Sequence, residues 1–406
     1  MTENPLKHKH ILLAVSGSIA AYKAVELASQ LTKTGALVDV ILTQAAEKLV
    51  SALTFRSVTG RKAFTDSDLW ENEEHVVHIT LARWANIMLI APASANSLAK
   101  LAHGIGDNLL SVTALAAACP LVVAPAMDAG MFSHPATQAN LKILQEHGAI
   151  ILGPAEGHLA SGLKGKGRML EAAELYAHLR YLLSRSNKLA GKKFLITAGG
   201  TQEALDPVRF LGNHSSGKQG YALAQAALDA GAEVTLISAP SALTPPVGTS
   251  FIPVVSAEDM RIKVMDHIEQ ADVVIMAAAV ADFRPAVSRT QKIKKESKLQ
   301  ELKLETTTDI LKALGDYKKS KKPAVLLVGF AAESEHLLEN ASRKLESKNL
   351  DLIVANDISR SDAGFAVDTN EATMLFRDGK QLKIPKQDKE GVSQKIIDTI
   401  INLLQE

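Results

Sequence analysis

The 406-residue chain lacks several features that would place it outside the cell, in a membrane or on nucleic acid. It has one cysteine, Cys119, so an intramolecular disulfide is excluded and a reducing cytoplasm is the expected location. Its 45 basic and 44 acidic residues nearly cancel, so we expect neither nucleic acid nor a membrane surface as a partner. No run approaches the roughly 18 apolar residues of a membrane-spanning helix. The first ten residues lack the apolar core of a signal peptide.

Aromatic residues are also scarce, at 4%, whereas hydrophobic residues make up 47% of the chain, which predicts aliphatic cores. Apolar strand-like runs alternate with helix-like segments twice, first from His10 and again from Lys193. This alternation predicts an α/β fold with two doubly wound, Rossmann-like domains. We expect the domains to span 1–183 and 193–406, joined by a polar, aperiodic linker over 184–192.

The stretch Thr197–Gly220, TAGGTQEALDPVRFLGNHSSGKQG, carries the densest set of polar groups in the chain. It lies between an apolar strand-like run and a helix-like segment, and Gly199 and Gly200 permit a sharp turn. Residues 215–218 place two hydroxyls, a glycine and a lysine where a helix begins, and free N–H groups there suit a phosphate. A simple connector would rarely carry so many specific groups, so this stretch predicts a ligand site.

Three small polar segments follow predicted strands of the first half: Ser16-Gly17-Ser18, Thr43 and the loop Ala91–Asn96. The carboxyl ends of parallel strands meet at one edge of a sheet, so these segments predict a cofactor crevice. The first turn lacks the third glycine of the dinucleotide fingerprint, which argues against a nicotinamide-linked oxidoreductase. Four glycines within 157–169 predict a flexible flap.

These motifs resemble those of the bacterial bifunctional phosphopantothenoylcysteine decarboxylase/phosphopantothenate–cysteine ligases of coenzyme A biosynthesis, over nearly the whole chain. The resemblance implies an N-terminal flavodoxin-like flavoprotein domain with FMN as cofactor and a C-terminal ligase domain. A lone histidine is more often structural than catalytic, but the resemblance implies a catalytic role for His78. The FMN-binding positions that it implies are Ser16, Gly17, Ser18, Thr43, Ser94 and Asn96.

Two positions in the first half depart from the family pattern. The family has Pro-x-Met-Asn, whose asparagine contacts the substrate carboxylate, but this chain has Pro-Ala-Met-Asp128. The family flap has Ala-Cys-Gly, whose cysteine returns a proton after CO₂ leaves, but this chain has Ala-Ser161-Gly. A serine hydroxyl is a far weaker acid than a thiol, whose unperturbed pKa is about 8.5.

Three interpretations of these departures remain open. Ser161 relays a proton from water or another acid; or Asp128, kept protonated by burial and its neighbours, binds the substrate carboxylate and supplies the proton; or this half releases an oxidised enethiol. Because the other motifs are intact, we favour retained decarboxylase activity with His78, Asp128 and Ser161 as catalytic residues.

In the second half, the resemblance implies that CTP, as co-substrate, activates 4′-phosphopantothenate to an acyl-cytidylate, which cysteine then attacks. Asn213 would hold the acyl group, Arg209 would organise the site, and Lys292 would form the acyl-nucleotide by neutralising charge that develops during attack. Without the resemblance, Lys292 would be one more solvated lysine in the charged segment 284–305, which is either a mobile loop or a short hairpin. The nucleotide-binding positions implied are Met276, Ala277, Ala278, Asp282, Lys292, Thr308, Asp309, Ile310, Leu311, Phe330, Lys344 and Lys348.

The expected partners are small molecules, namely 4′-phosphopantothenate, cysteine and CTP, with Mg²⁺ bridging the nucleotide phosphates through unknown protein ligands. The residues themselves do not distinguish CTP from ATP. The resemblance also implies a homo-oligomer, with trimeric contacts between flavin domains and dimeric contacts between ligase domains. One alternative is an active ligase whose N-terminal flavin domain is a binding or regulatory module without full decarboxylase turnover.

Overall fold

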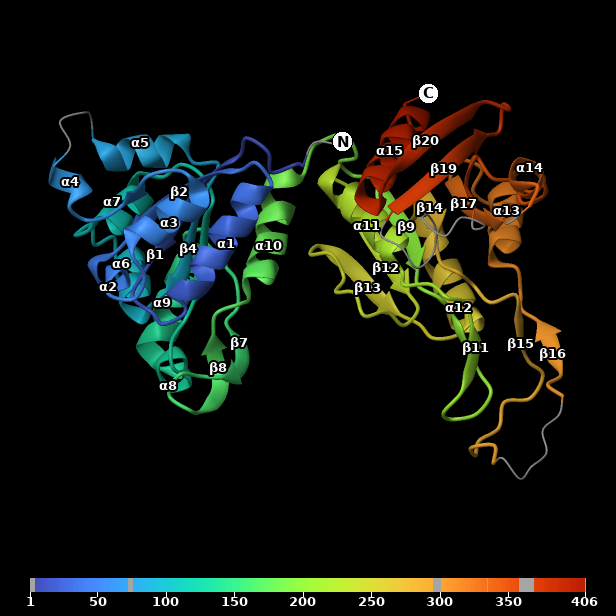
Figure 1. Ribbon diagram of the computed structural model, residues 1–406, viewed down its shortest axis with the longest axis horizontal. Coiled ribbons are helices and arrows are strands. Elements are labelled where there is room, and N and C mark those ends of the chain that lie inside the picture. Colours follow the sequence, from blue (N-terminus) through green and yellow to red (C-terminus); the bar gives the residue numbers. More distant parts are fainter. Residues whose placement is uncertain (1–3, 72–75, 295–300, 334, 358–368, 406) are drawn as a thin grey trace. The chain divides into compact units, whose positions relative to one another are not determined.

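The computed structural model describes residues 4–71, 76–294, 301–333, 335–357 and 369–405. The chain divides into two compact units, one ending at Ser184 and the other beginning at Arg185 (Figure 1). Each unit has its own parallel sheet with helices packed on it, so the predicted fold class of two doubly wound α/β domains is confirmed. No helix in the described part of the chain is long and apolar enough to cross a membrane.

The N-terminal unit is built on six parallel strands in the order β3-β2-β1-β4-β5-β6. Apart from the two-residue edge strand β3, this is the flavodoxin-like order 2-1-3-4-5. From β1 the next two strands are added on one side of the sheet, and β4, β5 and β6 are added on the other side. Open α/β sheets bind ligands at this point of reversal, here between β1 and β4. The strands are β1 (His10–Val15), β2 (Leu37–Leu42), β3 (Ala63–Phe64), β4 (Ile87–Ala93), β5 (Leu121–Pro125) and β6 (Ile150–Ile151).

Helices cover both faces of this sheet, and this two-sided burial explains the apolar run 11–15 of β1. Leu13 and Val15 belong to a core cluster with residues of α1 and α10, whereas Leu12 and Ala14 belong to a cluster with residues of α6, α7 and α9. Successive side chains of a strand point to opposite faces, so a strand covered on both faces must be apolar at every position. The helices are α1 (Ala21–Lys33), α2 (Gln44–Glu47), α3 (Ala52–Thr59), α4 (Asp68–Glu71), α5 (Val77–Trp84), α6 (Ala95–Ala102), α7 (Leu109–Ala116), α8 (Ala129–Ser133), α9 (Pro135–Glu146) and α10 (Ala172–Ser184).

The glycine-rich flap is an antiparallel hairpin of β7 (Ala155–His158) and β8 (Lys164–Arg168). Its second strand is held against the loop after β5, because the Met127 N–H donates to the Gly167 carbonyl at 3.0 Å. A β-carbon at Gly167 would lie 2.3 Å from the Met127 carbonyl oxygen, so glycine is required by this close approach. The flap is therefore anchored at its base, close to Asp128.

The C-terminal unit has eight strands in the order β13-β12-β9-β14-β17-β18-β19-β20, parallel except for β19 and β20. The order reverses between β9 and β14, which again predicts a ligand site at the carboxyl ends of these strands. Helices α12, α13 and α14 contribute to the core cluster of this sheet, and α11 packs against α15. The strands are β9 (Lys193–Ala198), β12 (Glu233–Ser238), β13 (Thr249–Pro253), β14 (Val273–Met276), β17 (Leu326–Glu333), β18 (Leu352–Asp357), β19 (Thr369–Phe376) and β20 (Gln381–Asp388). The helices are α11 (Lys218–Asp229), α12 (Ala257–His267), the 3₁₀ helix η1 (Ile268–Gln270), α13 (Ile310–Ser320), α14 (Leu337–Ser347) and α15 (Lys389–Leu403).

Two small hairpins and the segment after Ser184 complete this unit. Strand β10 (Gln202–Ala204) pairs with β11 (Phe210–Gly212), and β15 (Phe283–Pro285) pairs with β16 (Leu304–Thr306). The ends of the charged segment 284–305 thus form a short hairpin, while its residues 295–300 lie outside the described part of the chain.

The segment expected to be a linker, 184–192, makes backbone contacts within the C-terminal unit. Ser186 N–H donates to the Asp229 carbonyl at 2.9 Å, and Leu189 N–H donates to the Ala230 carbonyl at 2.8 Å. Leu189 is also buried.

Candidate active sites

A cavity of about 630 Å³ opens in the N-terminal unit where β1, β4 and β5 end. Its walls come from the turn after β1, the start of α6, the loop after β5, and the flap. This volume lies within the roughly 300–1,000 Å³ of typical small-molecule sites. The cavity therefore lies where the sheet topology predicts a ligand.

The turn after β1 and the loop after β4 are joined by buried Ser16. Its hydroxyl donates to the Pro92 carbonyl at 2.8 Å and accepts from the Ser94 N–H at 2.8 Å. A β-carbon at Gly17 would lie 2.5 Å from the β-carbon of Ala45, so only glycine fits under the segment that follows β2. The loops predicted to bind FMN thus form one connected surface.

The structure brings some of the predicted N-terminal residues to the cavity and leaves others outside it. Ser16 lies behind the cavity wall, and Thr43 accepts from the Ala46 N–H at 3.3 Å as the N-cap of α2. Asn96 is exposed on α6, and His78 lies on α5 with its Nδ1 buried and without a hydrogen-bond partner. The predicted residues that line the cavity are Gly17, Ser18, Ser94, Asp128 and Ser161.

The chemistry of the cavity fits a flavin that carries a phosphate. Ile19, Tyr22 and Met131 line it while remaining 62%, 60% and 51% exposed, and such apolar surface suits a planar ring. Ser18 and Ser94 supply hydroxyls, and Ser94 caps α6, whose N-terminal N–H groups suit a phosphate.

The two residues that depart from the family pattern contact each other. Ser161 Oγ, near the tip of the flap, donates to Asp128 Oδ2 at 2.6 Å, and Gly130 N–H donates to Asp128 Oδ1 at 2.9 Å. The hydrogen bond from Ser161, followed by that from Gly130, lowers the pKa of Asp128 below its usual value. The interpretation that burial keeps Asp128 protonated is therefore wrong for the free protein, because the side chain is partly exposed and held ionised.

Cys119 does not replace the missing flap thiol in this unit. It is not among the residues that line the cavity and packs instead beside a core cluster. Burial raises the pKa of its thiol, which disfavours the reactive thiolate.

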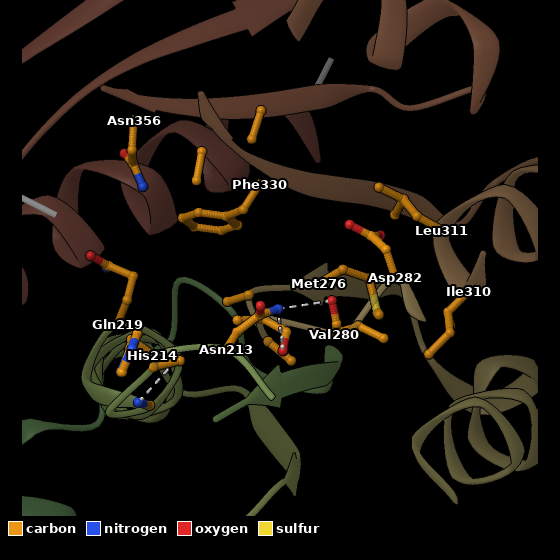
Figure 2. A pocket seen from close by; sticks show the side chains of 18 of the residues that line it. Asn213, His214, Gln219, Met276, Val280, Asp282, Ile310, Leu311, Phe330 and Asn356 are labelled. Atoms are coloured by element: carbon orange, nitrogen blue, oxygen red, sulfur yellow. Dashed lines mark hydrogen bonds between the residues drawn. The ribbon is translucent and has the colours of Figure 1, made fainter. Parts of the chain in front are cut away.

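A second cavity, of about 510 Å³, opens in the C-terminal unit beyond β14 and β17 and beside the start of α11 (Figure 2). Every predicted nucleotide-binding position except Lys292 lines it, together with the predicted acyl-binding residue Asn213. These positions are Met276, Ala277, Ala278, Asp282, Thr308, Asp309, Ile310, Leu311, Phe330, Lys344 and Lys348. Segments that are far apart in the sequence thus meet at the predicted edge of the sheet.

Hydrogen bonds and an ion pair fix several of these side chains. Asn213 Nδ2 donates to the Val280 carbonyl at 3.1 Å, which ties the loop before α11 to the segment after β14 (Figure 2). Asp309 caps α13 by accepting from the Lys312 N–H at 3.0 Å and pairs with Lys348 Nζ at 2.9 Å. Burial opposes the charged form of Asp309, but the bond from Lys348 and those from the backbone outweigh it and lower its pKa.

Arg209 and Lys292 do not line the cavity, but the buried carboxylate of Asp206 binds both the loop that carries Arg209 and the segment that carries Lys292. Arg209 Nη2 lies 2.6 Å from Asp206 Oδ2 and also donates to the Ile293 carbonyl at 2.6 Å. Ile293 N–H in turn donates to Asp206 at 3.1 Å. Burial would raise the pKa of Asp206, yet Arg209 and the surrounding N–H groups hold it well below its usual range. Lys292, next to Ile293, is thereby attached to the Arg209 loop.

Several polar cavity residues could not be found from a motif. Asn356 lies near the carboxyl end of β18, which was its only signal, and its Oδ1 is buried without a hydrogen-bond partner. Gln219 Nε2 donates to Ser393 Oγ at 2.7 Å, and Gln219 Oε1 accepts from Asn370 at 3.3 Å. Gln219 belongs to the stretch 197–220 predicted as a ligand site, whereas Asn370 and Lys389 line the cavity from β19 and α15 and are brought to it only by the tertiary fold.

Two doubly wound units, each with a cavity at the reversal point of its sheet, define a two-site α/β enzyme. Residues 1–184 match the family model described as Flavoprotein, and residues 189–404 match the DNA/pantothenate metabolism flavoprotein C-terminal domain. The chain belongs to the family of coenzyme A biosynthesis bifunctional proteins, which confirms the predicted resemblance.

Individual relatives match along both halves. The chain is 45% identical over 401 residues to the coenzyme A biosynthesis bifunctional protein CoaBC of Bacillus subtilis (strain 168), covering 98% of each sequence. It is 42% identical over 398 residues to the protein of the same name from Vibrio cholerae serotype O1, covering 97% of this chain and 98% of the relative. The solved C-terminal domain of a CoaBC protein is 43% identical, with a TM-score of 0.46, and the match covers 54% of this chain and 99% of that domain.

Proposed function

We propose that this protein converts 4′-phosphopantothenate and cysteine to 4′-phosphopantetheine in two steps, one in each unit. Family membership makes the chain a flavoprotein enzyme of coenzyme A biosynthesis with a decarboxylase half and a ligase half. The observation that supports this assignment of steps best is the presence of two separate cavities, each lined by the motif residues of one activity. A binding-only N-terminal unit is not favoured, because the relatives with the bifunctional name match across both halves.

The ligation would take place in the C-terminal cavity. The carboxylate of 4′-phosphopantothenate would attack CTP to give an acyl-cytidylate and pyrophosphate, and the cysteine amine would then displace CMP. Lys344 and Lys348 from α14 and its C-terminal end, with Lys292, would neutralise the phosphates, and Phe330 and Asp282, which line the cavity, would face the nucleoside. The choice of CTP comes from the family resemblance.

Mg²⁺ would enter with the nucleotide and be held mainly by its phosphates. Within the ranges that the structure describes, no group of three histidine, cysteine, aspartate or glutamate side chains could hold a metal ion. Mg²⁺ commonly keeps several waters and binds through substrate phosphates, which fits this arrangement.

The decarboxylation would take place in the N-terminal cavity. Gly17, Ser18 and Ser94 would hold FMN, while Ser16 and Thr43 support those loops and Asn96 borders them. Bound FMN would supply a two-electron oxidation of the thiol-bearing carbon and return the electrons after CO₂ leaves. The flap would limit the access of water to the substrate.

A neighbouring copy of the chain would complete this site. His78 lies outside the cavity on α5, and Val76 and Trp84 at the two ends of that helix are 54% and 61% exposed. Exposed apolar groups of this size support an interface between copies. We infer that N-terminal units form trimers that bring His78 to the cavity of a neighbour, and that C-terminal units form dimers.

Two measurements on the purified protein test these assignments separately. Flavin absorbance and its phosphate content would identify FMN, and pyrophosphate release would be compared between CTP and ATP with 4′-phosphopantothenate present. Asn213→Ala should retain pyrophosphate release but lower amide formation with cysteine by about 100-fold, because one preorganised contact to the acyl group is lost. A protein with neither flavin nor nucleotide-dependent pyrophosphate release would contradict the proposal.

A further inference from the structure

Asp128 and Ser161 connect the loop after β5 to the tip of the flap within the N-terminal cavity. We propose that Asp128 takes up one proton when the carboxylate substrate binds, shares it with the substrate carboxylate, and transfers it to the carbon that CO₂ leaves. Ser161 is then a positioning residue that stabilises Asp128 rather than the acid itself. This inference rests on the proposed decarboxylase function of the unit.

The cavity places a second carboxylate beside Asp128. It is lined both by the turns proposed to hold the flavin, at Gly17, Ser18 and Ser94, and by the Asp128–Ser161 pair. The reacting carbons of the substrate must lie against the flavin, so the carboxylate that leaves as CO₂ occupies the remaining space that Asp128 lines. Two carboxylates that share one site cannot both stay ionised unless cations neutralise them, and a shared proton is the usual result.

The cations of the cavity neutralise only one of the two carboxylates, because Lys23 and Arg168 share a single counter-charge, Glu171. Lys23 Nζ donates to Glu171 at 2.8 Å, and Arg168 Nη2 pairs with the same carboxylate at 2.5 Å. The Asp128 carboxylate itself is bound by a hydroxyl and a backbone N–H, neither of which cancels its charge. The titratable side chains that line the cavity with Asp128 are Tyr22 and Lys23 from α1 and His158 and Arg168 from the flap. Helix α8, which begins next to Asp128, carries no charged residue of its own, but Lys166 Nζ from β8 lies 5.6 Å from the centre of its Phe132 ring.

The stoichiometry of decarboxylation requires one proton for each turnover. The net reaction is R–CO₂⁻ + H⁺ → R–H + CO₂, which changes no overall oxidation state because a bound flavin would return its two electrons, so no outside oxidant is needed. When the carbon–carboxyl bond breaks, its electron pair and the negative charge stay with the substrate, and CO₂ leaves as a neutral molecule, so Asp128 no longer has a second carboxylate beside it. Asp128 then becomes a strong acid again, because Ser161 and Gly130 stabilise its ionised form. The proton moves to the substrate carbon, and the Asp128–Ser161 hydrogen bond forms again.

This cycle accounts for the joint replacement of the two family residues. An asparagine cannot carry a proton between solvent and substrate, so it needs a separate acid on the flap. An aspartate can carry the proton, and a serine is then sufficient on the flap because it donates to the ionised carboxylate.

Calorimetry of the flavin-loaded protein tests the proton uptake directly, without turnover. Binding is measured near pH 7 in two buffers of different ionisation enthalpy, which gives the number of protons taken up. The ligand is the serine analogue of the substrate, which keeps the carboxylate but has no thiol to oxidise. The matched ligand is 4′-phosphopantetheine, which has the same phosphate but no carboxylate, so proton changes at the phosphate cancel. The wild-type protein should take up about one proton more with the serine analogue than with 4′-phosphopantetheine.

Three variants identify the group that takes up the proton. Asp128→Asn should abolish the difference between the two ligands, whereas His158→Gln and the exposed surface control His147→Gln should keep it. Ser161→Ala should also keep it, because the carboxylate remains, but should slow the formation of 4′-phosphopantetheine because protonated Asp128 becomes a weaker acid. The affinity for the serine analogue should fall by about tenfold per pH unit above neutrality in the wild-type protein but not in Asp128→Asn.

Two results would overturn the inference. One is equal proton uptake with both ligands in the wild-type protein; the other is a difference that survives Asp128→Asn but disappears in His158→Gln or in His78→Gln, which would make an imidazole the acid. Failure of the proposed function would look different. In that case the protein would contain no flavin, or would release no CO₂ from phosphopantothenoylcysteine.

Discussion

Single residues of the two sites often serve the backbone and the ligand at the same time. Ser16 joins two loops of the N-terminal cavity, and Asp309 caps a helix while it pairs with Lys348. The sequence indicated these positions through motifs but not these contacts. The Asp128–Ser161 hydrogen bond in particular joins residues 33 positions apart, which no local pattern predicts.

Asp206 provides a test of stability at the residue scale. The pKa of Asp206 is lower in the folded protein than in the unfolded chain, where it is about 3.9. The carboxylate therefore adds to the free energy of unfolding in full above its unfolded pKa, and this stabilisation is lost as the pH falls through its folded pKa. Asp206→Asn should therefore lower the urea midpoint of the C-terminal unit at pH 7. The difference in urea midpoint between this variant and the wild-type protein should become smaller only below about pH 4. The exposed control Asp316→Asn should leave the midpoint unchanged, and a variant Asp206→Asn as stable as wild type at pH 7 would contradict this account.

At the scale of elements, apolar runs that alternate with helix-like segments were enough to predict both sheets. Continuous apolar runs such as that of β1 reflect burial on both faces, and that burial determines the pattern. The short edge strand β3 gave little signal because it is only two residues long. The glycines of 157–169 indicated a flexible flap, whereas the structure shows a hairpin anchored through Gly167.

The anchoring of the flap leads to a prediction for Gly167→Ala. The added β-carbon would lie 2.3 Å from the Met127 carbonyl and push β8 away from the loop that carries Asp128. Displacement of the Ser161–Asp128 pair by about 1 Å should lower the rate of CO₂ release by about 100-fold. Flavin content and pyrophosphate release should remain close to wild type, as should all activities of the control Lys164→Ala. A variant that loses flavin and CO₂ release together would indicate loss of the fold rather than of the flap.

At the scale of the whole molecule, each unit brings together residues that the motifs placed far apart in the chain. The C-terminal cavity gathers nearly all the predicted nucleotide positions, which come from β17, the end of β14 and the segment after it, the start of α13 and the end of α14. Asn370 and Lys389 join them only through the packing of β19 and α15 near α11, which the sequence could not specify. His78 stays outside the cavity of its own chain, so its proposed role depends on a second copy.

Complementation between inactive variants tests this shared site. His78→Ala and Asp128→Ala should each abolish CO₂ release by the homo-oligomer. If each site combines His78 of one copy with Asp128 of another, random mixed oligomers should recover about a quarter of the wild-type rate. Mixed oligomers that stay inactive, while purification through two different tags shows that they form, would place both residues in sites of a single chain.

The central claim is that one chain performs both steps, and a coupled assay tests it most directly. The purified protein is supplied with 4′-phosphopantothenate, cysteine, CTP and Mg²⁺, and pyrophosphate, CO₂ and 4′-phosphopantetheine are measured together. We expect one pyrophosphate and one CO₂ for each 4′-phosphopantetheine formed. Release of pyrophosphate with accumulation of phosphopantothenoylcysteine and no CO₂ would contradict the account.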